Sequence, residues 1–265
     1  RDGIPSIDKP VFVESEDADF LKDKDRVIGV YYNGIAKAYP IKILNWHEVV
    51  NDKFKDAAIL ISYCPLCNTG MVFSTQGKDV DFSFGVSGLL YNSDVLLCDR
   101  QTQSLWSQIL GKSISGPLKG VKLDLLPSSH TTWRQWQSKY PHSKVLSIDT
   151  GFRINYKKSP YIDYVRSSKL MFKVEHKNGS YRNKSLVLGL SLGNNHKAYP
   201  FTELSKQGLD SFDDNFAGEK LRIKWFEKDK TAMAYDEDGK ELATVLAYWF
   251  AWYAFHPQTD IFQSK

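Results

Sequence analysis

The sequence contains few of the residues that bind metals or form disulfides: 3 cysteines, 3 methionines and 6 histidines among 265 residues. Because the number of cysteines is odd, at least one of them is outside any intramolecular disulfide. Long apolar runs are absent too. The longest, residues 243–255, is too short for a bilayer and contains Thr244, so we expect no transmembrane segment.

The sequence has no strong excess of one charge, with 35 Lys and Arg against 31 Asp and Glu. No basic run is dense enough to favour nucleic acid, and we expect no nucleic-acid partner. A Ser-His-Asp arrangement, a glycine-rich phosphate loop and a glycosidase-like acid pair are also not recognisable. Hydrolase and nucleotide-binding functions therefore have no support in the sequence.

Aromatic residues are abundant, with 7 Trp and 14 Tyr, and glycines divide the sequence into short segments, which favours strands. Residues 27–32 and 36–39 read as a hairpin around Asn33-Gly34. Pro40 fits the first turn of a helix, which we expect over residues 41–50. At helical spacing, one apolar face of this helix carries Ile43, Trp46, His47 and Val50.

The hairpin–helix pattern occurs twice. Residues 27–44 align without a gap with residues 187–204, and after two additional residues the alignment continues to residues 59–73 and 221–235. We therefore predict a β-rich α+β fold. It would be made of two homologous β-hairpin–helix–β-hairpin halves, an internal duplication, with a barrel- or sandwich-like sheet core.

The expected domain organisation follows from this repeat. Its parts are an N-terminal arm (1–25), a first half that carries the site (26–145), a connecting segment (146–180) and a degenerate second half (181–265). Residues 131–139 read as a capped helix that ends before Pro141. The aromatic stretch from Val245 to Pro257 fits a strand or a helix equally well.

The candidate site is a Cys-x-x-Cys pair, Cys64 and Cys67, in a loop that Pro65 and Gly70 make tight. His47 is its expected third member, because the second copy replaces all three residues together, by Phe226, Asp229 and Gln207. Two thiolates and an imidazole suit copper, with zinc as the alternative. The fourth position would fall to His256, Met71, Cys98 or an exogenous ligand.

Further residues are expected around this centre. Asp94 and Tyr91 would orient a ligand, Trp46 would exclude water from the centre, and Met71 would lie next to it. Two other interpretations remain open. A Cys64–Cys67 disulfide would stabilise a non-catalytic structural or binding module. A thiol–disulfide oxidoreductase would use the same pair, although the βαβ context of thioredoxin-like proteins is missing.

Several long motifs resemble the DUF3179 family, and together they span nearly the whole chain. They are Ile43-Leu-Asn-Trp-His-Glu-Val-Val-Asn-Asp52, Tyr63-Cys-Pro-Leu-Cys-Asn-Thr-Gly70, Phe84-Gly-Val-Ser-Gly-Leu-Leu-Tyr-Asn-Ser-Asp94, Ser104-Leu-Trp-Ser-Gln108 and Trp249-Phe-Ala-Trp-Tyr-Ala-Phe-His-Pro257. The family is largely uncharacterised and its members commonly carry an export signal. The resemblance thus implies an extracytoplasmic protein, periplasmic or at the cell surface. Arg1 in place of Met agrees with a processed N-terminus.

The function we expect from these observations is extracytoplasmic copper binding. The centre would serve redox chemistry on a small molecule, as in a copper-dependent oxidoreductase, or electron transfer or copper handling. Its partner would be a small molecule or a redox protein.

Overall fold

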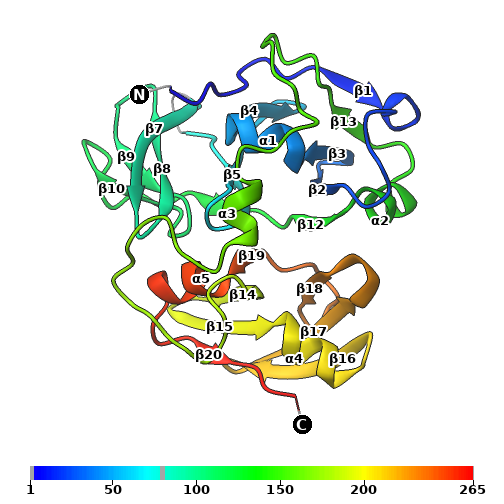
Figure 1. The fold of residues 1–265 in the computed structure, drawn as a ribbon, viewed down its shortest axis with the longest axis vertical. Helices are drawn as coiled ribbons and strands as arrows, with labels where there is room; N and C mark the ends of the chain where they lie inside the picture. Colours follow the sequence, from blue (N-terminus) through cyan, green and yellow to red (C-terminus); the bar gives the residue numbers. More distant parts are fainter. Residues whose placement is uncertain (1–2, 78–80, 265) are drawn as a thin grey trace.

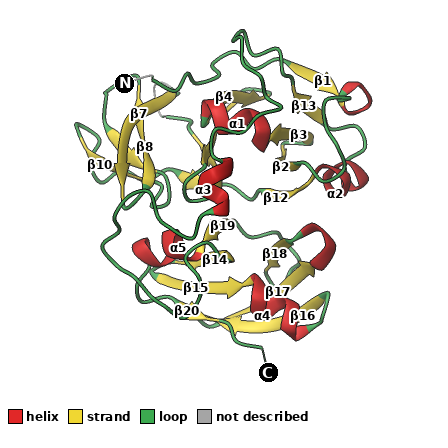
Figure 2. Cartoon of the chain, viewed as in Figure 1, coloured by secondary structure: helices red, strands yellow, loops and turns green. Residues whose placement is uncertain are grey.

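The computed structural model describes residues 3–77 and 81–264, so Arg1 and the expected N-terminal processing lie outside the described residues. Strands predominate and the helices are short (Figure 2). The chain forms two parts, one of N-terminal and one of C-terminal residues, with α3 (Ile162–Arg166) drawn between them (Figure 1). None of the described helices has the length and apolar character needed to cross a membrane.

The first part contains the predicted hairpin, and the elements from this hairpin to β6 follow the order expected from the sequence. They are β2 (Arg26–Tyr32), β3 (Ile35–Pro40), α1 (Ile41–His47), β4 (Val49–Phe54), β5 (Ala57–Cys64) and β6 (Thr69–Ser74). Strand β5 is buried along its whole length and pairs antiparallel with β4 and β6. Strand β5, which ends in Cys64, is therefore an inner strand of the sheet that contains β4, β5 and β6.

One earlier strand and two later strands complete the sheet around β2 and β3. Its strand order is β1-β13-β3-β2-β12, with β1 at Phe12–Glu14, β12 at Ser129–Thr132 and β13 at Lys144–Leu146. A short 3-10 helix, η1 (Ser15–Asp17), follows β1. Helix α2 (Trp133–Lys139) joins β12 to β13, and the hydroxyl of Thr132 caps it by accepting a hydrogen bond from the N–H of Gln135.

A further set of strands lies between β6 and β12. It comprises β7 (Phe84–Tyr91), β8 (Asp94–Asp99), β9 (Leu105–Ser107) and β10 (Lys112–Ser115), which form a sheet of their own, and β11 (Asp124–Leu125), which pairs with β6. This insertion contributes Asp94 at the start of β8.

The second part has the same element order without that insertion. Its elements are β14 (Leu186–Leu192), β15 (Asn195–Pro200), α4 (Phe201–Gln207), β16 (Ser211–Phe216), β17 (Glu219–Phe226), η2 (Glu227–Asp229), β18 (Thr231–Tyr235), β19 (Thr244–Tyr248), α5 (Trp249–Phe255) and β20 (Asp260–Ile261). Pairing runs from Val187↔Pro200 to Leu192↔Asn195, as it does from Val27↔Pro40 to Tyr32↔Ile35. Strands β19 and β20 pair with β14 and β15 as β12 and β13 pair with β2 and β3.

The same close contact fixes the helix against the sheet in both parts. A Cβ atom added to Gly29 would lie 2.1 Å from the ring of Trp136, and one added to Gly189 would lie 2.2 Å from the ring of Trp252. Only glycine allows each indole ring to approach the sheet this closely. A partly buried ion pair is shared as well, because Lys37 binds Asp52 at 2.8 Å and Lys197 binds Asp214 at 2.5 Å.

Two expectations need correction. The first helix ends at His47 instead of Val50, because Glu48 adopts a left-handed conformation (φ 57°) and Val49 starts β4. Among the described residues the strands form several open sheets, and no closed barrel is present. The aromatic stretch near the C-terminus, for which strand and helix were both open, contains both: β19 followed by α5.

Candidate metal site

The two cysteines lie on the loop between β5 and β6. Cys64 is the last residue of β5. The N–H of Cys67 donates a hydrogen bond of 3.2 Å to the carbonyl oxygen of Cys64, and this bond closes the turn. Asn68 completes the loop in the left-handed region (φ 53°). Both cysteines are buried and neither is in a disulfide. The turn therefore places two thiols side by side in the protein interior.

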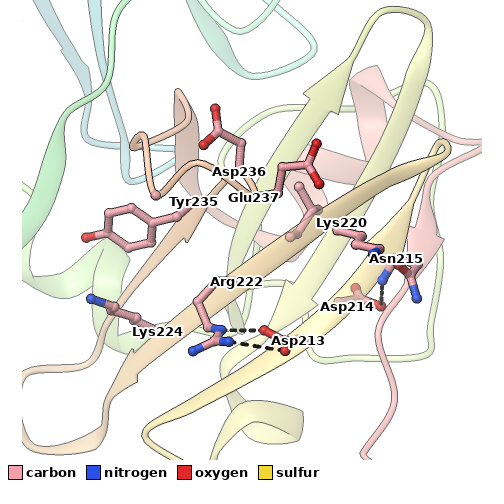
Figure 3. A pocket seen from close by; sticks show the side chains of 11 residues that line it. Asp213, Asp214, Asn215, Lys220, Arg222, Lys224, Tyr235, Asp236 and Glu237 are labelled. Carbon is pink, nitrogen blue, oxygen red and sulfur yellow. Dashed lines mark hydrogen bonds and ion pairs between the residues drawn. The ribbon is translucent and has the colours of Figure 1, made fainter.

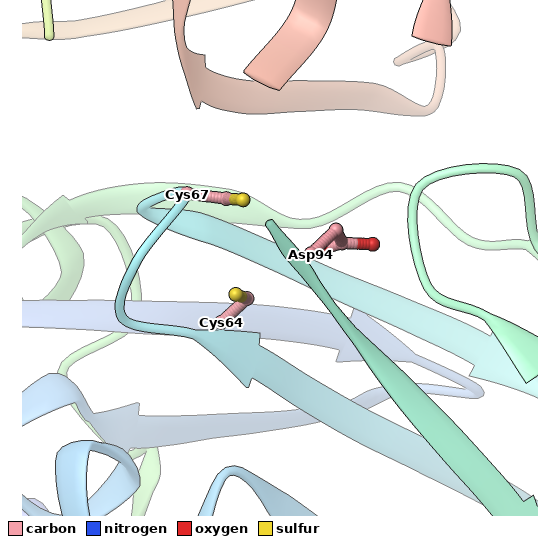
Figure 4. Close-up of side chains that lie close together, drawn as sticks. All are labelled: Cys64, Cys67 and Asp94. Carbon is pink, nitrogen blue, oxygen red and sulfur yellow. The ribbon is translucent and has the colours of Figure 1, made fainter. Parts of the chain in front are cut away.

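A carboxyl group from the insertion completes a group of three potential ligands. Asp94 follows the left-handed residues Asn92 and Ser93 of the β7–β8 turn and is fully buried. One oxygen of Asp94 and the two sulfur atoms all lie within 4.8 Å of one another. Figure 4 shows the three side chains, from β5, from the loop after it and from β8, gathered in one place. In the described part of the chain this is the group in which three potential metal-ligand atoms of cysteine, histidine, aspartate or glutamate lie this close together.

Asp94 is poorly compensated at this position. Its Oδ2 accepts a hydrogen bond of 3.1 Å from the N–H of Ile109, but its Oδ1 has no hydrogen-bond partner among the described residues. Burial raises the pKa of Asp94 to about 7. Burying an oxygen atom without a hydrogen-bond partner costs free energy, and a bound ligand, water molecule or ion would offset this cost.

The thiols are subject to the same effect. Burial raises the pKa of Cys64 and, more strongly, that of Cys67. Cys67 donates a hydrogen bond of 3.3 Å to the carbonyl oxygen of Ser93, the residue before Asp94. No described lysine or arginine forms an ion pair with Asp94. In the thiolate and carboxylate forms the cluster would therefore hold negative charge without a balancing cation from the described chain.

Glu48 is a second buried carboxyl group in this region. The hydroxyl of Tyr161 donates a hydrogen bond of 3.2 Å to its Oε1, and burial raises the pKa of Glu48 to about 7, to which the proximity of Asp94 also contributes. Glu48 is a site residue that no sequence motif predicts. The available clue in the sequence was the position of Glu48 next to His47. The left-handed backbone of a glutamate cannot be recognised from a sequence pattern.

His47 is buried, but the structure does not bring it into the ligand group. Its Nδ1 lies 2.7 Å from the carbonyl oxygen of Pro5, and its Nε2 lies 2.6 Å from the hydroxyl of Tyr156. Both ring nitrogens thus have protein partners, and burial lowers the pKa of His47. The structure therefore does not bring the predicted ligand His47 together with the two cysteines. The third potential ligand atom near the sulfurs belongs to Asp94, a residue that the sequence predicts to orient a ligand.

The other candidate residues have different surroundings. His256 directly follows α5, so it lies about 10 Å from the N-terminus of this seven-residue helix. Its ring packs against the rings of Trp252 and His196, with ring centroids 4.2 Å and 3.9 Å away. Met71 is buried in the same apolar cluster as both cysteines. Tyr91 packs edge-on against Phe255, at 5.5 Å between ring centroids. His256 therefore does not join the ligand group.

Trp46 and Cys98 also lie outside it. The indole N–H of Trp46 donates a hydrogen bond of 3.0 Å to the carbonyl oxygen of Lys158. Cys98 is four residues after Asp94 on β8, which separates their backbones by about 13 Å.

A surface pocket of about 650 Å³ lies on β16, β17 and the end of β18 (Figure 3). It is lined by charged side chains, and two of these, Arg222 and Asp213, form an ion pair with each other. Its lining contains no cysteine or histidine. Because this pocket lacks the soft ligands and the buried, uncompensated groups of the cysteine cluster, that cluster is the stronger candidate for the functional site.

One comparison with known proteins identifies a family. The family model described as "Protein of unknown function (DUF3179)" matches residues 1–246, which confirms the resemblance seen in the motifs. No curated protein and no solved structure was found to match the chain.

Proposed function

We propose that this chain, which belongs to the DUF3179 family, binds a thiophilic metal ion through Cys64, Cys67 and Asp94. The observation that carries the proposal is a buried group of two thiols and one carboxyl group, whose ligand atoms lie within 4.8 Å of one another. One oxygen of this carboxyl group has no hydrogen-bond partner among the described residues. Such a group is unfavourable as anions alone and becomes favourable around a cation.

The separations between the ligand atoms suit a metal ion. In a tetrahedral zinc–thiolate site with bonds of about 2.3 Å, neighbouring ligand atoms are about 3.8 Å apart. Ligand atoms within 4.8 Å of one another therefore need to move by only about an ångström to reach a common ion. Three protein ligands leave a coordination position for an exogenous molecule.

Copper is the ion we propose, with zinc as the alternative. Thiolates favour both ions and disfavour magnesium and calcium, and a carboxylate completes a set that both accept. With copper, the open position would serve redox chemistry on a small molecule, electron transfer to a partner protein, or copper handling. Zinc would restrict the site to Lewis-acid chemistry or a structural role.

The thiol–disulfide oxidoreductase alternative has less support. A reactive cysteine needs a lowered pKa, which a helix N-terminus or a nearby cation usually provides. Burial raises the pKa of both Cys64 and Cys67 instead. Without a metal ion neither thiol would be an effective nucleophile at neutral pH.

The proposal includes an internal duplication and an extracytoplasmic location. The matching strand order and register of β2–β3 and β14–β15, and the matching Gly29–Trp136 and Gly189–Trp252 contacts, support two halves of common origin. Only the first half would keep the metal site, since Phe226 and Asp229 take the places of Cys64 and Cys67. The location rests on the export that the family resemblance implies.

The test is metal analysis of protein purified without oxygen and without added chelator. We expect one equivalent of copper and, after oxidation, a thiolate-to-copper charge-transfer band in the visible spectrum. One equivalent of zinc without such a band would replace copper by zinc. A protein that takes up neither ion, even after reduction and titration with each, would rule out the proposal.

Matched variants locate the site. Cys64→Ser, Cys67→Ser and Asp94→Asn should each weaken metal binding, because each removes one ligand. Cys98→Ser is the control and should bind as the unmodified protein does, since Cys98 lies along β8 outside the ligand group.

A further inference from the structure

We infer that Glu48 is a positioning residue of the metal site: its side chain fixes Tyr161 and, through Tyr161, the segment that covers Cys64 and Cys67. This covering segment is defined here as residues 156–175, which include α3. The inference rests on the proposed function for its biological meaning. Its test uses metal-free protein, so the two can fail separately.

The backbone of Glu48 is the first observation. Glu48 is the C-cap of α1 in a left-handed conformation, with φ 57°. At the corresponding C-cap of α4 the second part has Gly208, with φ 66°. A left-handed position costs a residue with a Cβ atom about 1 kcal/mol and costs glycine nothing. Glu48 bears this cost, and in return its side chain can make contacts that glycine cannot make.

The contacts of that side chain are the second observation. The carboxyl group of Glu48 is buried and accepts a hydrogen bond from Tyr161, which precedes α3. Its two neighbours contact the same segment, because Trp46 donates to the carbonyl oxygen of Lys158 and His47 is bonded to Tyr156. Three consecutive residues thus hold the covering segment.

The second part lacks all three side chains, since Lys206, Gln207 and Gly208 occupy the corresponding positions at the end of α4. This difference explains why the second part lacks counterparts of both His47 and the cysteines. His47 would serve the same site by holding the covering segment, without contacting the metal ion.

The covering segment reaches the cysteine loop itself. The hydroxyl of Tyr164, within α3, donates a hydrogen bond of 3.0 Å to the carbonyl oxygen of Leu66, between the two cysteines. Further along, the hydroxyl of Ser93 donates to the carbonyl oxygen of Phe172, and the N–H of Glu175 donates to Asn92. The segment is therefore fastened to both loops that carry the proposed ligands.

The experiment is alkylation of metal-free, reduced, folded protein with iodoacetamide, followed by mass spectrometry of the peptides. Its rate reports how often the cover opens over Cys64 and Cys67, and Cys98 on β8 is the internal reference. Glu48→Gly and Tyr161→Phe should each accelerate alkylation of Cys64 and Cys67 about tenfold, as expected for the loss of one buried hydrogen bond. The rate at Cys98 should not change.

Two further variants separate positioning from a general structural role. Glu48→Gln keeps an oxygen acceptor for Tyr161 and should retain the unmodified rate within about twofold. The double variant Glu48→Gly/Tyr161→Phe should be no faster than either single variant, because both remove the same contact. Glu48→Gly should also leave the free energy of unfolding nearly unchanged, since relief of the left-handed strain offsets the lost hydrogen bond.

Other outcomes would overturn the inference. They are an unchanged rate at Cys64 and Cys67 in Glu48→Gly, equal acceleration at Cys98, or additive effects in the double variant. Failure of the protein to bind copper or zinc would overturn the proposed function alone, because the alkylation rates do not depend on a bound ion.

Discussion

The backbone N–H of Tyr248 donates a hydrogen bond of 2.8 Å to the carbonyl oxygen of Cys67. Tyr248 is the N-cap of α5, so the second part of the molecule holds the cysteine loop directly, although Phe226 and Asp229 stand there in place of the cysteines. The loop is held from two sides, by α5 at Cys67 and by α3 at Leu66. The second part of the molecule therefore contributes directly to the position of the candidate site.

The contact of Gly189 with Trp252 makes α5 sensitive to one methyl group. In Gly189→Ala the new Cβ atom would lie 2.2 Å from the indole ring, so the helix must shift. We expect a loss of about 2 kcal/mol or more in the free energy of unfolding, measured in urea. Gly179→Ala is the matched control, because its Cβ atom meets nothing within 4 Å, and it should change stability by less than about 0.5 kcal/mol.

His47→Gln separates the cover from the ligands. This variant introduces the residue that stands at the corresponding position of α4, Gln207. We expect metal content to stay at one equivalent while the free energy of unfolding falls by about 1–2 kcal/mol, because the bonds to Pro5 and Tyr156 are weakened. A variant that is as stable as the unmodified protein but has lost its metal would return His47 to the ligand set.

The metal-free protein should lose stability as the pH rises from about 4 to about 7. Burial raises the pKa of Asp94 from 3.8 to about 7, so the folded state binds more protons than the unfolded state in this range. The stability present below the unfolded pKa is lost as the pH rises through the folded one, up to a few kcal/mol. Urea unfolding at several pH values should show a flatter dependence for Asp94→Asn than for the unmodified protein; equal slopes would contradict the assignment.

Metal affinity should change with pH in the opposite direction. Burial raises the pKa of Cys64 and Cys67, so both thiols are protonated near neutrality and must release their protons to bind an ion. Above pH 7, where Asp94 is largely ionised, we expect the apparent affinity to rise about hundredfold per pH unit. Competition with a chromophoric chelator measures this slope. A slope near zero would show that the thiols are not the ligands.

The sequence predicted the local elements well because they follow local rules. Asn33-Gly34 forms the expected turn, Pro40 precedes α1, and Thr132 caps α2. The end of α1 was wrong because it depends on a left-handed Glu48. In that conformation the side chain of Glu48 accepts a hydrogen bond from Tyr161, which is more than a hundred residues away.

The candidate site was predictable only in part, for the same reason. Cys64 and Cys67 are close in sequence, so their spacing was sufficient to pair them. Asp94 reaches them through the pairing of β7 with β8 and the position of that sheet beside β5, and neither leaves a periodic signal near the residue. The contacts of His47 could not be predicted, because its partners, Pro5 and Tyr156, come from irregular segments.

The covering segment has a consequence for how an ion enters. In the folded protein this segment is bonded to the cysteine loop through Tyr164. An ion present from the start of refolding can reach the sulfurs while the chain is unfolded and the cover is not yet in place. An ion added later has to wait for the tyrosine contacts to break. The speed of loading therefore depends on when the metal is supplied, even where the final affinity is the same.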